Sequence, residues 1–241
     1  NESKELGNWY VGQKQGEIWG YETYGLFQSE QEIAGAANQD KVSGGIKLMP
    51  GDIRFVDRNN DGVIDWGDNT VDNPGDKKII GNSTPRYHYG INLGADWKGF
   101  DLGIFFQGVG KRDLYLPGTS FRSHYGSEWQ VPSAYNNDYW TEENTGAYFP
   151  RARFNGGSAI NQAQTRYMVD ASYCRLKSVS IGYTLPKVLT QKASIEKIRI
   201  YFTGENLFTI SDTPDGLDPE LDSPYTYPMQ RSLSVGLSLT F

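Results

Sequence analysis

The ten residues from 232 to 241 alternate strictly between two kinds of side chain, and this pattern constrains the fold more than any other in the chain. Large apolar residues occupy every second position, and serine, glycine or threonine occupies each position between them. A period of two is typical of a β-strand, whose successive side chains point to opposite faces. One apolar face and one small polar face suit a barrel with lipid outside and a polar lumen inside. The segment therefore predicts a strand of an outer-membrane β-barrel, with Phe241 at the membrane boundary.

Further segments upstream carry the same two-faced chemistry, and their lengths approach the 9 to 11 residues of a tilted spanning strand. They are residues 91–97, 101–107, 175–185 and 197–206. The pair Lys98-Gly99 joins the first two segments and predicts a hairpin turn.

The lengths of the connections indicate which side of the membrane each one faces. Strand parity places the Lys98-Gly99 turn and the connection 186–196 on the side of the chain terminus, and periplasmic turns of barrels are short. The long connections 108–173 and 207–231 then lie outside the cell. We expect an all-β fold, namely an antiparallel transmembrane β-barrel segment with long extracellular loops.

Composition and motifs argue against several other classes of protein. No stretch approaches the ~18 consecutive apolar residues of a membrane-spanning helix. The net charge is −6 and the basic residues are scattered, so nucleic acid is not an expected partner. The two histidines belong to no zinc or serine-hydrolase motif, so we expect no enzyme, although the many carboxylates leave a glycosidase-like pair open on composition. The single cysteine, Cys174, is expected to be a small apolar filler in a strand.

The strongest local motif is residues 57–68, which match the template of a twelve-residue calcium loop with glycine at position 6. Four carboxylates in so short a loop repel one another without a cation, so we expect a structural Ca²⁺. The alternative is a metal-free Asx–Gly turn, which such residues also favour. The predicted ligands are Asp57, Asn59, Asp61, the carbonyl of Val63, Asp65 and Asp68.

The long connection after residue 108 is rich in aromatic residues set among turn formers. Long loops usually need a small core of their own, so such rings can pack the loop upon itself. The alternative is that some of the rings face the lumen or its mouth and stack on a substrate. The candidate substrate-binding residues are Trp129, Tyr139 and Trp140.

An ordered series of motifs along the chain resembles the SusC/RagA family of TonB-dependent outer-membrane transporters. The resemblance covers nearly the whole chain, and the order of its motifs is the family's order. The segments that carry it are residues 20–27, 50–53, 57–65, 80–87, 99–102, 106–108, 171–177, 204–208 and 218–220, with Phe241 at the end.

The resemblance implies the closing strands of a barrel of ~22 strands. Residues 1–88 are then an extended and extracellular loop region that holds the calcium-type loop, and residues 89–241 are C-terminal barrel strands and loops. The plug is expected to lie outside this chain, which starts at Asn1 without a leader and is expected to be a piece of a longer precursor. Phe241 would serve as the outer-membrane assembly signal.

The resemblance also implies a function, namely import of glycans, or of oligopeptides, across the outer membrane. The implied partners are a SusD-like surface lipoprotein over the mouth, the TonB complex acting through the missing N-terminal part, and the remaining strands and plug of the same transporter. The alternative is a surface or secreted glycan-binding β-domain stabilised by calcium. Such a domain would stay soluble without detergent, whereas a barrel segment would enter the outer membrane.

Overall fold

The computed structural model describes residues 4–115, 125–126, 138–154, 158–191, 194–221 and 226–241. The chain forms two compact units. One unit comprises Asn1–Thr84 and Asp113–Val169, and the other comprises Pro85–Arg112 and Asp170–Phe241. The sequence analysis expected a single boundary between residues 88 and 89. In the structure the first unit ends at Thr84, and it also includes Asp113–Val169 from the connection that follows β6.

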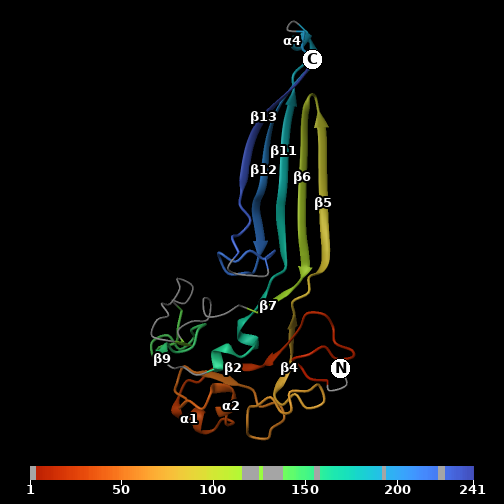
Figure 1. Cartoon of the computed structure of the whole chain (residues 1–241). Coiled ribbons are helices and arrows are strands. Elements are labelled where there is room, and N and C mark those ends of the chain that lie inside the picture. The colour runs from red at the N-terminus through yellow and green to blue at the C-terminus, as the bar shows by residue number, and fades with distance from the viewer. Residues whose placement is uncertain (1–3, 116–124, 127–137, 155–157, 192–193, 222–225) are drawn as a thin grey trace. The chain divides into compact units, whose positions relative to one another are not determined.

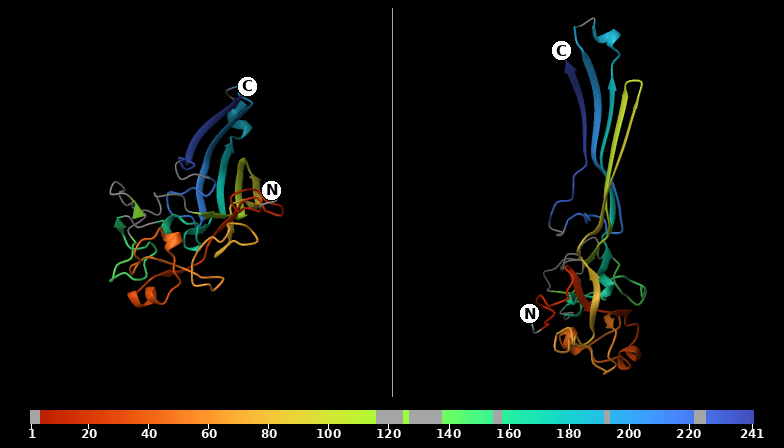
Figure 2. Two further views of the ribbon diagram at one scale, coloured as in Figure 1. Left: turned by 60° about the horizontal axis from the view of Figure 1, so that its bottom comes forward. Right: turned by 90° about the vertical axis from the view of Figure 1, so that its right-hand side faces the viewer.

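The second unit is an antiparallel five-stranded sheet in the order β13-β12-β11-β6-β5 (Figure 1). Its strands occur where the alternating pattern predicted them, and β5, β6 and β12 run further than the pattern indicated. In two further views these long strands also lie side by side (Figure 2). The strands are β5 (Arg86–Trp97), β6 (Phe100–Lys111), β11 (Tyr173–Thr184), β12 (Lys197–Ser211) and β13 (Ser232–Thr240).

The register of the sheet separates apolar from polar side chains. Residues directly opposite each other in an antiparallel pair share a face. One transverse row is wholly apolar, and the next row along the strands holds only glycine, serine and threonine. The apolar row is Ala95, Leu102, Ile181, Phe202 and Val235, and the polar row is Gly94, Gly103, Ser180, Thr203 and Ser234.

A bulge in β11 changes which side chains reach the polar face. The register shifts between Leu176 and Ser178 against both neighbouring strands: Lys177 is an extra residue against β6, and it stands against the two residues 206–207 of β12. Before the bulge, Arg175 pairs with Gln107 and Thr209 on the polar face. An uninterrupted alternation would have placed this arginine on the apolar face with Ile181.

An ion pair on the polar face spans the central strand. Arg199 of β12 donates to Asp101 of β6 in a bidentate arrangement, with Nε to Oδ2 at 2.9 Å. The two side chains meet over Gly182 of β11, where a Cβ atom would lie 2.4 Å from Asp101 Oδ2 and 2.5 Å from Arg199 Nε. Only glycine leaves room for this bridge across the strand.

The ends of the sheet differ in their connections. The Lys98-Gly99 turn and the short helix α4 (Lys187–Thr190) lie at the same end as residue 241, and the connection from β12 to β13 lies at the opposite end (Figure 1). The predicted segregation of short and long connections is therefore present in this unit.

No helix in the described residues has the length and apolar character to cross a membrane.

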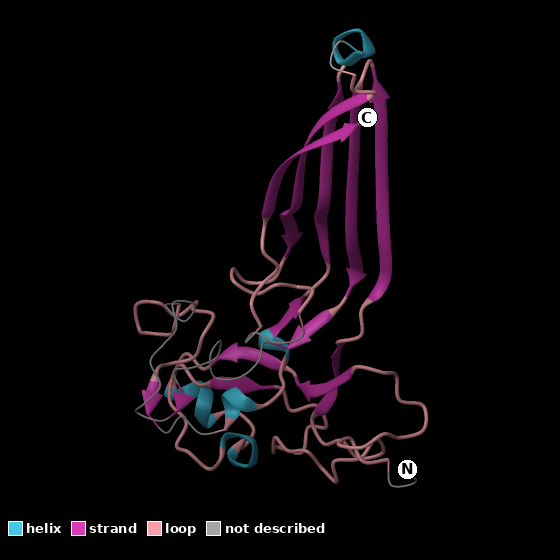
Figure 3. Ribbon diagram, turned by 45° about the horizontal axis from the view of Figure 1, so that its top comes forward, coloured by secondary structure: helices cyan, strands magenta, loops and turns pink. Residues whose placement is uncertain are grey.

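The first unit contains several two-stranded sheets and short helices (Figure 3). Its core buries aromatic and branched side chains, including Tyr21, Phe27, Ile53, Ile64 and Ile160. The paired strands are β1 (Glu17–Tyr21) with β4 (Lys77–Asn82), β2 (Thr23–Leu26) with β3 (Ile53–Phe55), and β8 (Tyr125–Gly126) with β9 (Arg153–Phe154). The helices are α1 (Glu30–Ala34), α2 (Asp40–Ser43), η2 (Ala159–Asn161) and η3 (Thr165–Tyr167).

A further strand pair joins β7 (Asp113–Tyr115), in the first unit, to β10 (Met168–Asp170), whose residues lie at the division between the units.

Candidate functional site

The calcium-type loop connects β3 to β4, and hydrogen bonds to backbone N–H groups hold its carboxylates. Asp57 accepts from the N–H groups of Asn60 at 2.7 Å and Gly62 at 2.9 Å. Asp61 accepts from the N–H of Val63 at 2.8 Å. Such side-chain-to-backbone bonds are the Asx turns that this composition favours. The loop is therefore ordered by its own backbone donors.

Asp76 is a buried anchor of this loop that the sequence analysis missed. Its carboxylate accepts from the N–H of Arg58 at 2.7 Å and from the N–H of Asp65 at 2.8 Å, so it ties both halves of the loop to the start of β4. Burial raises its pKa, while these backbone donors oppose the rise. An isolated acidic residue after a turn gives no sequence signal of such a role.

The predicted calcium ligands are only partly brought together. Within the described residues, no three histidine, cysteine or acidic side chains form a group suited to a metal. Asp65 is engaged by Lys41 at 2.6 Å, and this hydrogen bond lowers the pKa of the carboxyl group. Asp68 accepts from Asn73 at 2.9 Å. Calcium binding would require Lys41 to leave Asp65, and it stays a prediction.

Trp140 is a buried residue of the first unit. Only 3% of it is exposed, and its indole N–H donates to Gln28 Oε1 at 3.2 Å. The ring packs against Gly51, where a Cβ atom would lie 2.6 Å from the indole. Gly51 also has a φ of +95°, so the Pro50-Gly51 motif has two steric reasons for glycine. This placement corresponds to the packing alternative for the aromatic residues.

Tyr139 lies beside Trp140 at a shallow pocket and is 39% exposed. The pocket has a volume of about 360 Å³, and it is also lined by Glu142, Glu143 and Arg151. Arg151 stacks over the Trp140 ring at 4.9 Å. An exposed phenol beside acidic and basic groups can contact a polar ligand. The third candidate, Trp129, lies outside the described residues.

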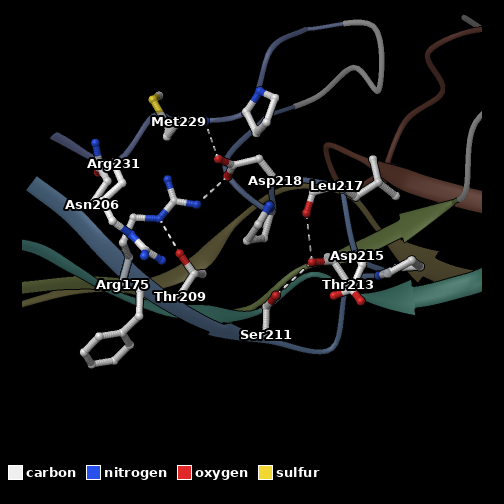
Figure 4. A pocket seen from close by; sticks show the side chains of 15 residues that line it. Arg175, Asn206, Thr209, Ser211, Thr213, Asp215, Leu217, Asp218, Met229 and Arg231 are labelled. Carbon is white, nitrogen blue, oxygen red and sulfur yellow. Dashed lines mark hydrogen bonds and ion pairs between the residues drawn. The ribbon is translucent and has the colours of Figure 1, made fainter.

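A larger pocket of about 510 Å³ opens at the loop end of the five-stranded sheet (Figure 4). Arg175 reaches it from β11 and donates from Nη2 to Asp218 at 2.6 Å and from Nε to Thr209 at 2.7 Å. Asp218 also accepts from the N–H of Met229 at 2.9 Å. These bonds hold the connection from β12 to β13 on the polar face.

A second basic side chain strengthens this attachment. Lys177 donates to Glu220 at 2.8 Å, and Arg175 Nη1 lies 3.4 Å from the same carboxylate. Two of the motifs that carried the family resemblance, residues 171–177 and 218–220, therefore bind each other. The pocket presents hydroxyl, amide, carboxylate and guanidinium groups, which can bind polar ligands.

Comparison with known proteins gives the family. No family model matches the chain. TonB-dependent receptor P3 of Formosa agariphila is 31% identical over 95% of this chain and 22% of its own length. TonB-dependent receptor SusC of Bacteroides thetaiotaomicron is 29% identical over 78% of this chain and 17% of its own length. The chain is of the SusC/RagA type of TonB-dependent transporter.

Solved structures support the fold of this SusC/RagA-type chain. The RagAB peptide transporter aligns with a TM-score of 0.65 at 21% identity, over 93% of this chain and 23% of that one. The RagAB peptide importer in its closed-closed state gives a TM-score of 0.66 at 22% identity, over 97% of this chain and 24% of that one. The chain thus spans less than a quarter of the length of these relatives.

Proposed function

We propose that this chain forms part of the barrel wall of a transporter that imports glycans, or oligopeptides, across the outer membrane. The observation that carries the proposal is the five-stranded sheet with one apolar face and one small polar face. An apolar face such as the row through Leu102, Ile181 and Phe202 suits hydrocarbon, and the opposite face suits a hydrated lumen.

The proposal also accounts for the free edges of the sheet. In the described residues, β5 and β13 each pair on one side only. Unpaired backbone groups in hydrocarbon cost several kcal/mol each, so further strands of the same transporter have to flank this sheet. The plug and the segment that contacts the TonB complex would belong to that remaining part.

A SusD-like surface lipoprotein is the proposed partner at the extracellular mouth. The long connections would face it, and one of them carries the partly exposed ring of Tyr139. No step is covalent, because transport consists of capture, displacement of the plug and release. The protein is therefore proposed to be a transporter without enzymatic activity.

Deletion of the gene tests this function directly. The deletion strain is expected to lose growth on one class of substrate when single glycans and peptides are supplied in turn, and the intact gene is expected to restore it. The full-length protein is expected in the outer-membrane fraction and to need detergent for extraction. Undiminished growth on all substrates, or recovery in the soluble fraction, would contradict the proposal.

The aromatic candidates are tested in the complemented strain. Tyr139→Ala and Trp129→Ala are expected to slow uptake with normal amounts of protein in the membrane. Trp140→Ala is expected to lower the amount of folded protein, because its ring is buried. Equal uptake by the wild type and by Tyr139→Ala would remove Tyr139 from the substrate path.

A further inference from the structure

A pocket of about 340 Å³ in the first unit contains two arginine side chains, and neither belonged to any motif of the sequence analysis. Arg54 comes from β3, and Arg166 comes from η3. The rest of the wall is formed by β2, by the residues around α1 and by residues 145–147. The volume is that of a small binding site, large enough for part of a longer ligand.

Arg54 is held by stacking and keeps its hydrogen-bond donors available. Its guanidinium lies over the ring of Tyr24 at 5.2 Å and over the ring of Phe27 at 5.8 Å. Its ion-pair partner among the described residues is Glu32, at the long distance of 4.0 Å. Glu32 already accepts from the N–H of Gln28 at 2.8 Å. The planar guanidinium is thus fixed in position with donors left for a ligand.

Arg166 is fixed by the backbone on the other part of the wall. Its Nε donates to the carbonyl of Tyr148 at 2.7 Å, and Nη2 donates to the carbonyl of Ala147 at 2.6 Å. These bonds leave Nη1 as a donor. Its charge also helps to lower the pKa of Asp138, after the hydrogen bonds from Asn144 and Tyr148. Among the described residues, Glu32 thus faces the guanidinium of Arg54 and Asp138 interacts with that of Arg166.

Several acceptors of the remaining wall already accept hydrogen bonds. Gln28 donates to the carbonyl of Leu26 at 2.9 Å and to that of Thr145 at 3.4 Å, and the buried Trp140 holds the Gln28 carbonyl. An extended peptide needs main-chain acceptors and donors along its path. The carbonyls of Leu26 and Thr145 already accept hydrogen bonds from Gln28, so they offer little main-chain pairing to a peptide. Tyr24, by contrast, is 70% exposed and presents an open ring beside Arg54.

We propose that Arg54 and Arg166 form a subsite for a carboxylate or sulfate group on an acidic oligosaccharide, with the exposed ring of Tyr24 stacking on an adjacent sugar. Guanidinium groups bind such anions with charge-assisted hydrogen bonds. The inference rests on the proposed transport function and names the class of its substrate. Arg54 supplies the free charge, and Arg166 mainly sets the shape of the wall.

The test uses the full-length transporter with its lipoprotein partner, purified in detergent. The probes are short oligouronates and sulfated oligosaccharides, each compared with its methyl-esterified or desulfated form. The wild type is expected to bind at least one acidic probe about tenfold more tightly than its neutral form. Arg54→Gln is expected to abolish this preference, and Arg54→Lys is expected to retain part of it. Arg86→Gln makes the same charge change at an exposed arginine outside the pocket and is expected to change nothing.

Three results would overturn the inference. The first is equal binding of acidic and neutral forms throughout the panel. The second is an equal loss of affinity in Arg54→Gln and Arg86→Gln. The third is a charge preference, dependent on Arg54, that is seen only with acidic peptides compared with their amides. If the deletion strain loses growth on a neutral substrate, the proposed transport function is supported. In that case only the proposed anion subsite is refuted.

Discussion

Arg175 and Asp218 form a buried ion pair that joins β11 to the connection between β12 and β13. The distance from Nη2 to Oδ1 is 2.6 Å, and 4% and 3% of the two side chains are exposed. Burial alone would raise the pKa of Asp218, but Arg175 and the backbone N–H groups of Glu220 and Met229 hold the pKa below its usual value. The Asp218 carboxylate is therefore ionised at neutral pH and bonded to Arg175 and to these backbone N–H groups.

Arg175→Met is expected to release the connection between β12 and β13, because it leaves Asp218 buried without its counter-charge. Removing one partner of a buried pair typically costs about 3 to 5 kcal/mol. Limited proteolysis of the full-length protein is expected to cleave this connection sooner in the variant. Lys177→Met, at a more exposed pair, is the control and is expected to have a smaller effect. Equal cleavage of Arg175→Met and wild type would refute the role of the pair.

Acid is expected to loosen the same connection. A depressed pKa in the folded state contributes stability above the ordinary value of 3.8, and this contribution is lost as the pH falls through the depressed value. Hydrogen exchange at residues 212–221 is expected to be constant from neutral pH down to that range and to rise below it, after correction for intrinsic rates. Asp218→Asn is expected to exchange faster at neutral pH and to respond less to acid. A variant with the wild-type profile would show that Asp218 is not the group responsible.

Gly182→Ala is expected to disturb the bridge from Arg199 to Asp101, because the new methyl group would overlap both side chains. Overpacking of this kind costs roughly 1 to 3 kcal/mol. Gly103→Ala is a matched control on the neighbouring strand, since a Cβ atom there has nothing within 4 Å. Heat-modifiability on gels is expected to show a lower unfolding temperature for Gly182→Ala alone. The same temperature for both variants would argue against a steric role of Gly182.

Calcium is expected to bind the loop of residues 57–68 and to raise the unfolding temperature of the first unit. Asp61→Ala is expected to abolish the calorimetric signal of a Ca²⁺ titration. Lys41→Met is expected to strengthen binding, because it frees Asp65. Absence of heat in both the wild type and Lys41→Met would establish the loop as a metal-free turn.

Removal of Phe241 is expected to lower the amount of transporter in the outer membrane. The family resemblance implies that this terminal aromatic is read during assembly, and the residue is 83% exposed, so it contributes little to packing within this chain. Membrane fractionation measures the effect, with Leu239→Ala as a control that leaves the terminus intact. Normal membrane levels of the truncated protein would contradict an assembly role.

The strands could be predicted from sequence because their signal is local. The alternation within one segment, such as residues 232–240, indicates which of its side chains share a face. No information from other segments is needed for this prediction. The Lys98-Gly99 turn was equally local, and Lys98 adopts the positive φ of 48° that a tight turn requires.

The binding groups could not be predicted, because they depend on contacts between distant residues. Arg54 and Arg166 stand far apart in the chain and meet only through the fold of the first unit. Asp76 supports a motif that ends before it. Trp140 looked like a candidate for ligand contact, yet the glycine at position 51 makes room to bury it. Whether a side chain is buried depends on the residues that pack against it, so the residue type alone did not reveal the burial of Trp140.

The bulge at Lys177 reverses the alternation of side chains along β11, so the residues before it and after it follow opposite patterns of facing. Beyond it, small side chains line the polar face, and before it the same face receives Arg175. If Lys177 instead took a regular place in the alternation of the same twelve residues, Arg175 would fall in phase with Ile181 and its guanidinium would turn toward the apolar side. One further residue inserted beside the bulge would have the same effect, so homologues are expected to accept few insertions between residues 175 and 178.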